Sequence, residues 1–185
     1  VATVHKPDVK TFEVDHQNLD IHVHVGNSKA STRYAGISMT GVTVKESPDW
    51  LKDKLNTIGV RPINNVVDVT NYILFAFGQP LHCFDADKIT TRKVEVKTLP
   101  EGTAFVTLDE QERKLSERDL MICNGNEPMC IAGVFGGLKS GATEKTTNIF
   151  IESAYFHPTW VRKTARRHGL NTDASFRFER GVDPN

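Results

Sequence analysis

The chain has 185 residues, of which 38% are hydrophobic and 25% are charged, a composition typical of a soluble globular domain with one buried core. Lysine plus arginine (23) equals aspartate plus glutamate (23), so any RNA contact must come from a local basic patch or from another part of a larger assembly. Three cysteines without Cys-x-x-Cys spacing argue against a disulfide framework and favour a reduced, cytoplasmic setting, and no apolar stretch is long enough to span a membrane.

The first half of the chain is predicted to hold two extended segments and two helices. Residues 21–25 alternate between apolar and polar types, and residues 33–45 are rich in β-branched side chains. A short helix is predicted over residues 47–58, with Ser47 as its N-cap. Residues 64–77 have strand-like composition, but their apolar positions recur every three or four residues, so we interpret this segment as a helix.

The second half is predicted to alternate short strands and turns before a final helix. Short strands are expected between residues 93 and 121, and the apolar run 129–135 suits a strand that is buried on both faces. A further strand is predicted over 147–152, and the last element is a helix that begins near Pro158 and ends at Gly169. This order predicts a mixed α/β sandwich with several strands and three or four helices.

Three features could carry chemistry, and each also has a structural interpretation. The glycine-rich run 133–137 follows an apolar segment, where it would either bring the backbone close to a ligand or simply make a turn. Glu152 ends an apolar strand, so its carboxylate must face a pocket or pair with one of the C-terminal arginines. His82, with Asp85 nearby, would either orient a substrate or serve the fold. The residue types alone leave these alternatives open.

Other patterns give weaker indications. His22 and His24 share one face of a predicted strand, but no further His, Cys or acidic residues cluster with them, so we expect no metal site. No motif supports a Ser-His-Asp triad. The last helix carries a basic face that is either simply solvated or in contact with RNA phosphates, and it consists of Arg162, Lys163, Arg166 and Arg167.

Several motifs follow one another in a specific order. They are RPINNVVDVTNY (61–72), GQPLHCFD (78–85), AGVFGG (132–137), IESAYF (151–156), ARRHGLNTDAS (165–175) and RFERGVDP (177–184). This set resembles the B3/B4 domain of bacterial phenylalanyl-tRNA synthetase β subunits. The resemblance implies a mixed α+β fold, a layered β-β-α sandwich with a mixed sheet. We expect one composite domain over residues 1–185, with a weakly matched strand region at 1–30 and the core at 31–185.

The resemblance also implies a site. In this family the domain hydrolyses Tyr-tRNA(Phe), the product of mistaken charging, and Glu152 matches the residue that accepts a hydrogen bond from the phenol of tyrosine. The positions matched to the reacting ester and terminal ribose are His82, Thr70 and Asn71. Those matched to the binding of the amino acid are Glu152, Gly133, Ala132, Gly136, Thr172 and Ala174. Cys83 and Phe135 depart from the commonest family residues, which affects the shape of the pocket and not its polar groups.

The expected function is therefore hydrolytic proofreading within a larger enzyme. We expect the chain to be a fragment that lacks the aminoacylation site and needs no cofactor, whereas the parent enzyme would use ATP and Mg²⁺. The expected partners are the 3′ end of tRNA(Phe) carrying tyrosine, the synthetase α subunit and the rest of the β subunit. The alternative is a non-catalytic scaffold of the same synthetase that docks tRNA or a subunit.

Overall fold

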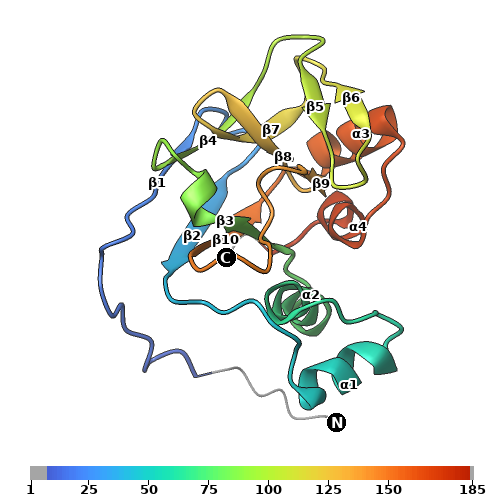
Figure 1. Ribbon diagram of the computed structural model, residues 1–185. Coiled ribbons are helices and arrows are strands. Elements are labelled where there is room, and N and C mark those ends of the chain that lie inside the picture. Colours follow the sequence, from blue (N-terminus) through green and yellow to red (C-terminus); the bar gives the residue numbers. More distant parts are fainter. Residues whose placement is uncertain (1–7, 184–185) are drawn as a thin grey trace.

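Two β-sheets, a short hairpin and four α-helices make up residues 8–183, the part of the chain that this computed structural model describes (Figure 1). The larger sheet has five strands in the spatial order β1 (His22–Val25), β4 (Lys93–Thr98), β7 (Leu120–Asn124), β8 (Glu127–Ile131) and β9 (Phe135–Gly136). β1 runs parallel to β4, and the other pairs in this sheet are antiparallel. The sheet is therefore mixed, as the resemblance implies.

The smaller sheet is antiparallel and positions the candidate site. Its spatial order is β2 (Arg33–Met39), β10 (Ile149–Tyr155) and β3 (Leu81–Asp85). The register places Glu152 opposite Gly36 on one side and opposite His82 on the other. Directly opposed residues project from the same face of a sheet, so the carboxylate and the imidazole are neighbours. A separate hairpin joins β5 (Ala104–Val106) to β6 (Glu112–Lys114).

The helices form two pairs that lie at different sides of the sheets (Figure 1). α1 (Asp49–Thr57) packs on α2 (Asn65–Phe77), and α3 (Pro158–His168) packs on α4 (Asp173–Arg180). α2 starts where the side chain of Asn64 accepts hydrogen bonds from the amides of Val66 and Val67. It ends at Gly78, whose φ of 75° lies in the left-handed region that glycine adopts without strain.

One apolar core connects both sheets to α3 and α4. Its fully buried side chains include Phe84, Phe150, Phe156, Met121, Ile122 and Ile131. α3 contributes Val161 and Ala165, and α4 contributes Phe178. Each large apolar side chain that is removed from water stabilises the fold by roughly 1.5–3 kcal/mol. Helices α3 and α4 are therefore held by the same core that supports the smaller sheet.

The mixed α+β class and most of the predicted elements are confirmed. The ambiguous segment at 64–77 is a helix, and the helix from Pro158 to Gly169 is present as predicted. The prediction of Ser47 as an N-cap is wrong. Pro48 occupies that position, and the hydroxyl of Ser47 instead donates a hydrogen bond to the buried carboxylate of Asp68 over 2.5 Å.

Two further differences have local causes. The apolar run 129–135 is not one strand, because the chain turns between β8 and β9 at Gly133, which has a φ of 69°. The helix from Pro158 is not the last element, since α4 follows it. The side chain of Thr172 accepts from the amide of Ser175, and the Ser175 side chain accepts from the amide of Thr172, so the two form a capping box that starts α4.

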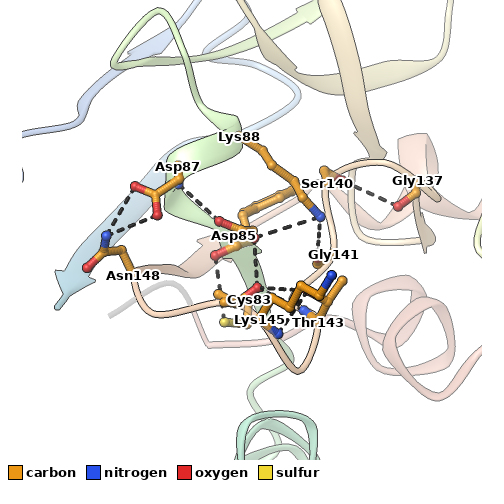
Figure 2. Close-up of polar contacts among 12 residues, drawn as sticks. Cys83, Asp85, Asp87, Lys88, Gly137, Ser140, Gly141, Thr143, Lys145 and Asn148 are labelled. Carbon is orange, nitrogen blue, oxygen red and sulfur yellow. Dashed lines mark hydrogen bonds and ion pairs between the residues drawn. The ribbon is translucent and has the colours of Figure 1, made fainter. Parts of the chain in front are cut away.

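A network centred on Asp85 holds the loop that follows β9 (Figure 2). The Asp85 carboxylate accepts a hydrogen bond from the Thr146 hydroxyl over 2.7 Å, and the Asp85 amide donates to the carbonyl of Ser140. Lys88, in the 3-10 helix η1 (Ala86–Lys88), lies 3.8 Å from the same carboxylate and donates to the carbonyl of Gly141 over 2.8 Å. These contacts tie the loop to the end of β3 and so constrain β9, which borders the candidate site.

Candidate functional site

A cavity of about 270 Å³ lies where α2, β3, the β8–β9 turn, β10 and the start of α4 meet. This volume is close to the lower end of the range of small-molecule pockets and suits a ligand the size of an amino acid. Most of its wall is apolar, and its polar groups come from separate elements. The polar side chains that line it are Thr70, Asn71, His82, Glu152, Thr172 and Asp173.

The structure brings together nearly all of the residues predicted for the site. The lining includes the three positions expected at the ester, which are Thr70, Asn71 and His82. It also includes five of the six positions expected to bind the amino acid, which are Glu152, Gly133, Gly136, Thr172 and Ala174. Ala132 is the exception, because it is 3% exposed, packs in the core and does not line the cavity.

Glu152 is a buried carboxylate, 4% exposed, that has no basic partner among residues 8–183. No lysine or arginine of this part of the chain lines the cavity. The salt bridge to a C-terminal arginine, which the sequence left open, is absent from the described residues. Burial raises the pKa of the Glu152 carboxyl to about 7, although a hydrogen bond from Tyr34 opposes the rise.

Tyr34 supplies that hydrogen bond from β2. Its phenol donates to Oε2 of Glu152 over 2.6 Å. The other oxygen, Oε1, accepts no hydrogen bond within residues 8–183. Because Glu152 lines the cavity, that oxygen can accept a hydrogen bond from a ligand. Burial and the nearby carboxylate of Glu152 raise the pKa of Tyr34 well above its usual range, so the phenol remains a donor.

His82 is held as a neutral imidazole. Its Nε2 atom is the one buried side-chain nitrogen or oxygen of the described residues that lacks a hydrogen-bond partner. Burial lowers the pKa of His82 to about 4. The ring packs edge-on against Phe84, with 4.4 Å between centroids, which fixes its orientation. A neutral imidazole has one donor nitrogen and one acceptor nitrogen, so His82 can form a hydrogen bond with a ligand in either direction.

Two glycines leave space that a side chain would fill. A Cβ atom at Gly136 would lie 2.9 Å from Cε1 of His82 and 3.0 Å from Cδ1 of Leu108, so a larger residue would narrow the cavity. A Cβ atom at Gly133 would lie 2.9 Å from the ring of Phe178, and its φ of 69° already favours glycine. The glycine-rich run therefore both makes the turn and shapes the cavity.

Buried polar groups anchor the two helices that border the cavity. Asp68 is fully buried in α2 and accepts hydrogen bonds from the hydroxyl of Ser47 and the amide of Ile63. This pairing fixes the first turn of α2 before Thr70, whose hydroxyl donates to the carbonyl of Val67. The hydroxyl of Thr172 donates to the carbonyl of Val134 over 2.9 Å, which ties α4 to the β8–β9 turn.

The predicted basic face lies on α3, outside the cavity. Arg162, Lys163 and Arg166 are exposed and form no ion pair within the described part of the chain. Arg167 differs, because its guanidinium pairs with the fully buried carboxylate of Asp119. The sequence did not separate this structural arginine from the other three, since its partner lies 48 residues earlier in the chain.

Asp119 also accepts a hydrogen bond from His168 over 2.7 Å. Burial alone would raise the pKa of Asp119, but hydrogen bonds from His168, the Ser116 amide and Thr164 outweigh this effect and hold the pKa below its usual range. The cluster therefore joins α3 to the start of β7 as an ion-pair network. None of its side chains lines the cavity.

Sequence reasoning missed Tyr34, which hydrogen-bonds Glu152, and several residues of the cavity wall, among them Asp173 and Leu108. Tyr34 lies in a predicted extended segment, where the residue pattern can indicate a strand but not the long-range partner of a side chain. Its partner, Glu152, is 118 residues away in the sequence.

His22 and His24 lie on the exposed strand β1, and His22 lies 3.2 Å from Asp20. Residues 8–183 contain no group of three His, Cys, Asp or Glu side chains arranged to hold a metal ion.

The sequence of this chain is similar to that of known proteins. The B3/4 domain family matches residues 30–185. The chain is 74% identical over 184 residues to the phenylalanine–tRNA ligase β subunit of Bacteroides thetaiotaomicron, covering 100% of this chain and 22% of that protein. It is 62% identical over 165 residues to the corresponding subunit of Porphyromonas gingivalis, covering 89% of this chain and 20% of that protein. The chain thus spans about a fifth of the length of these relatives.

A solved structure shares the fold. The crystal structure of an N-terminal fragment of the phenylalanyl-tRNA synthetase β-subunit from Pyrococcus horikoshii has a TM-score of 0.55 and 14% sequence identity. The match covers 77% of this chain and 45% of that one. At this identity the likeness concerns the fold alone. In the described part of the chain, no helix combines the length and the apolar character needed to cross a membrane.

Proposed function

The chain belongs to the B3/4 domain family, as found in phenylalanyl-tRNA synthetase β subunits, and from this premise we propose that it hydrolyses the ester of tRNA(Phe) mischarged with tyrosine. The observation that carries the proposal is the buried carboxylate of Glu152, which keeps one free oxygen in an apolar cavity without a basic partner. Natural folds rarely keep a buried carboxylate in this state unless a ligand uses it.

The chemistry of the two amino acids explains why a second pocket is useful. A synthetic pocket shaped for phenylalanine rejects the same ring with one extra hydroxyl only by about a hundredfold. A pocket that requires the hydroxyl discriminates in the opposite direction. Bound tyrosine would donate its phenol to Oε1 of Glu152, whereas bound phenylalanine would leave that oxygen desolvated and unpaired, at a cost of roughly 1–3 kcal/mol. Tyrosine would therefore be retained and hydrolysed, and phenylalanine would be released.

The remaining polar groups suit a hydrolysis that depends on positioning. His82 offers an unpaired Nε2, and because its pKa is about 4 it is neutral at physiological pH and can orient the ester, the terminal ribose or a water molecule. From α2, Thr70 brings a hydroxyl group and Asn71 a side-chain amide to the wall of the cavity. The start of α4 places the positive end of a helix dipole at the cavity, where it favours an oxyanion.

The tRNA, the α subunit and the rest of the β subunit are the proposed partners. The three exposed, unpaired cations of α3 support contact with RNA phosphates. The competing proposal is a non-catalytic scaffold that docks tRNA or a subunit through the same basic face. The two proposals differ in what they require of the cavity, since only hydrolysis depends on the free oxygen of Glu152.

A deacylation assay separates them. The synthetase that carries this domain is incubated with Tyr-tRNA(Phe) or Phe-tRNA(Phe), and the loss of the ester is followed over time. We expect rapid loss of Tyr-tRNA(Phe) alone, and we expect Glu152→Ala to abolish the preference for tyrosine. If Glu152→Ala cleared both esters at the parental rates, the scaffold proposal would be favoured.

A further inference from the structure

Glu152 has one hydrogen-bond donor among the described residues, and that donor is a tyrosine of the chain itself. The phenol of Tyr34 reaches Oε2 diagonally across the β2–β10 pair, because the residue directly opposite Glu152 is Gly36. A side chain at position 36 is excluded, since its Cβ would lie 2.2 Å from the ring of Phe150. The ring of Phe150 therefore covers this part of β2 and adds to the apolar surroundings of the carboxylate.

Apart from Tyr34, the groups that face Glu152 do little to stabilise its ionised form. His82 faces it from β3 and is neutral. Cys130 lines the same cavity from β8, and burial, with a contribution from Glu152, raises the pKa of its thiol, which keeps it protonated. Asp173 lines the cavity from α4 and brings no positive charge to it. Among the described residues no lysine or arginine lines the cavity, so the phenol of Tyr34 is the group that favours the ionised carboxylate.

We propose that Tyr34 is a positioning residue for the recognition of tyrosine: by holding Oε2 of Glu152, it counteracts the effect of burial on the charged carboxylate and leaves Oε1 free to accept the phenol of the substrate. This inference rests on the proposed function for its consequence in proofreading, but the contact with Glu152 can be tested by itself. A charged acceptor forms a hydrogen bond roughly twice as strong as a neutral one. Tyr34 therefore acts on specificity without touching the substrate.

The first test measures the ionisation of Glu152 directly. The side-chain carboxyl carbons of glutamate are labelled with ¹³C in the 185-residue chain and titrated by NMR, and the Glu152 signal is identified by its loss in Glu152→Gln. The expected midpoint is about 7 in the parent. Tyr34→Phe should raise it by about one to two pH units, because a hydrogen bond to the charged form is lost.

Tyr155→Phe is the matched control, since it removes a phenol from β10 of the same sheet without touching Glu152. It should leave the midpoint unchanged. The remaining glutamate signals report whether each variant is folded. A midpoint in folded Tyr34→Phe that equals or falls below the parental value would overturn the role of Tyr34.

The second test uses the assembled synthetase and measures the deacylation of Tyr-tRNA(Phe) against pH. The preference for the tyrosyl ester should depend on pH with a midpoint of its own. Tyr34→Phe should raise this midpoint by the same number of pH units as it raises the midpoint of the Glu152 carboxyl in the NMR titration. An identical pH profile in the parent and in Tyr34→Phe would overturn the inference while leaving the proposed function intact. If the parent showed no deacylation at any pH, the proposed function would fail, and the NMR titration would still decide the role of Tyr34.

Discussion

Replacing Glu152 with glutamine should stabilise the fold above neutral pH. Burial raises the pKa of Glu152 from 4.5 to about 7. The fold therefore favours the protonated carboxyl, and the stability that comes from this preference is fully present below about pH 4.5 and is lost as the pH rises through 7. A glutamine keeps the shape of the protonated group but does not titrate. The difference in pKa corresponds to roughly 3 kcal/mol of unfolding free energy at high pH.

The assay is urea unfolding of the parent and of Glu152→Gln at pH 4.5 and pH 8.5. Both proteins keep His82, whose opposite pH dependence cancels in the comparison. The variant should match the parent at the lower pH and exceed it by up to roughly 3 kcal/mol at the higher pH. Glu144→Gln, at an exposed position, controls for the loss of one carboxyl and should change stability by about 0.5 kcal/mol or less. An equal difference between the parent and Glu152→Gln at both pH values would refute the reasoning.

Three other substitutions test the cavity, the ion-pair network around Asp119 and the basic face of α3, one substitution for each feature. Gly136→Val should lower Tyr-tRNA(Phe) deacylation by about tenfold or more, because its side chain would fill space beside His82, and a rate assay measures this. Asp119→Ala should lower the unfolding free energy by about 1–3 kcal/mol, since it leaves the buried His168 side chain and the Ser116 amide without their acceptor, and urea unfolding measures this. Arg166→Ala should weaken tRNA binding and reduce the slope of log affinity against log salt by about one, as titration at several salt concentrations would show.

Each of these changes has a control elsewhere in the chain. Gly141→Ala places its Cβ no closer than 3.8 Å to another residue and should leave deacylation unchanged. Asp109→Ala breaks an ion pair with Arg113 at a more exposed position and should destabilise the fold far less than Asp119→Ala does. Lys54→Ala removes an exposed cation from α1 and should not alter tRNA binding. Equal effects of a variant and its control would contradict the corresponding assignment.

Patterns of neighbouring residues predicted the helices that are defined by apolar spacing over a dozen residues. Residues 64–77 contain the helix that their apolar spacing predicts, and the structure bounds it with the capping side chain of Asn64 and the left-handed Gly78. The break between β8 and β9 was missed because Gly133 lies inside a continuous apolar run, and periodicity carries no information about a positive φ. α4 was missed because it has only 8 residues and starts at a capping box that uses Ser175 in place of the commoner glutamate or glutamine.

The cavity could be predicted only through the family resemblance. Its polar residues come from α2, β3, β10 and α4, and their meeting depends on strand register. From the residues alone, Glu152 could equally have formed a salt bridge, and only the three-dimensional arrangement brings Tyr34 to it. Ala132 illustrates the opposite error, since it lies next to Gly133 in the motif but faces the core.

The most direct test of the central proposal is a side-by-side measurement of Tyr-tRNA(Phe) and Phe-tRNA(Phe) hydrolysis by the synthetase that carries this domain, with and without Glu152→Gln. The account predicts that the parent hydrolyses the tyrosyl ester and spares the phenylalanyl ester. It also predicts that the variant loses roughly tenfold or more of that preference, in line with the loss of a hydrogen bond to a charged acceptor. Equal hydrolysis of both esters by the parent, or an unchanged preference in the variant, would contradict it.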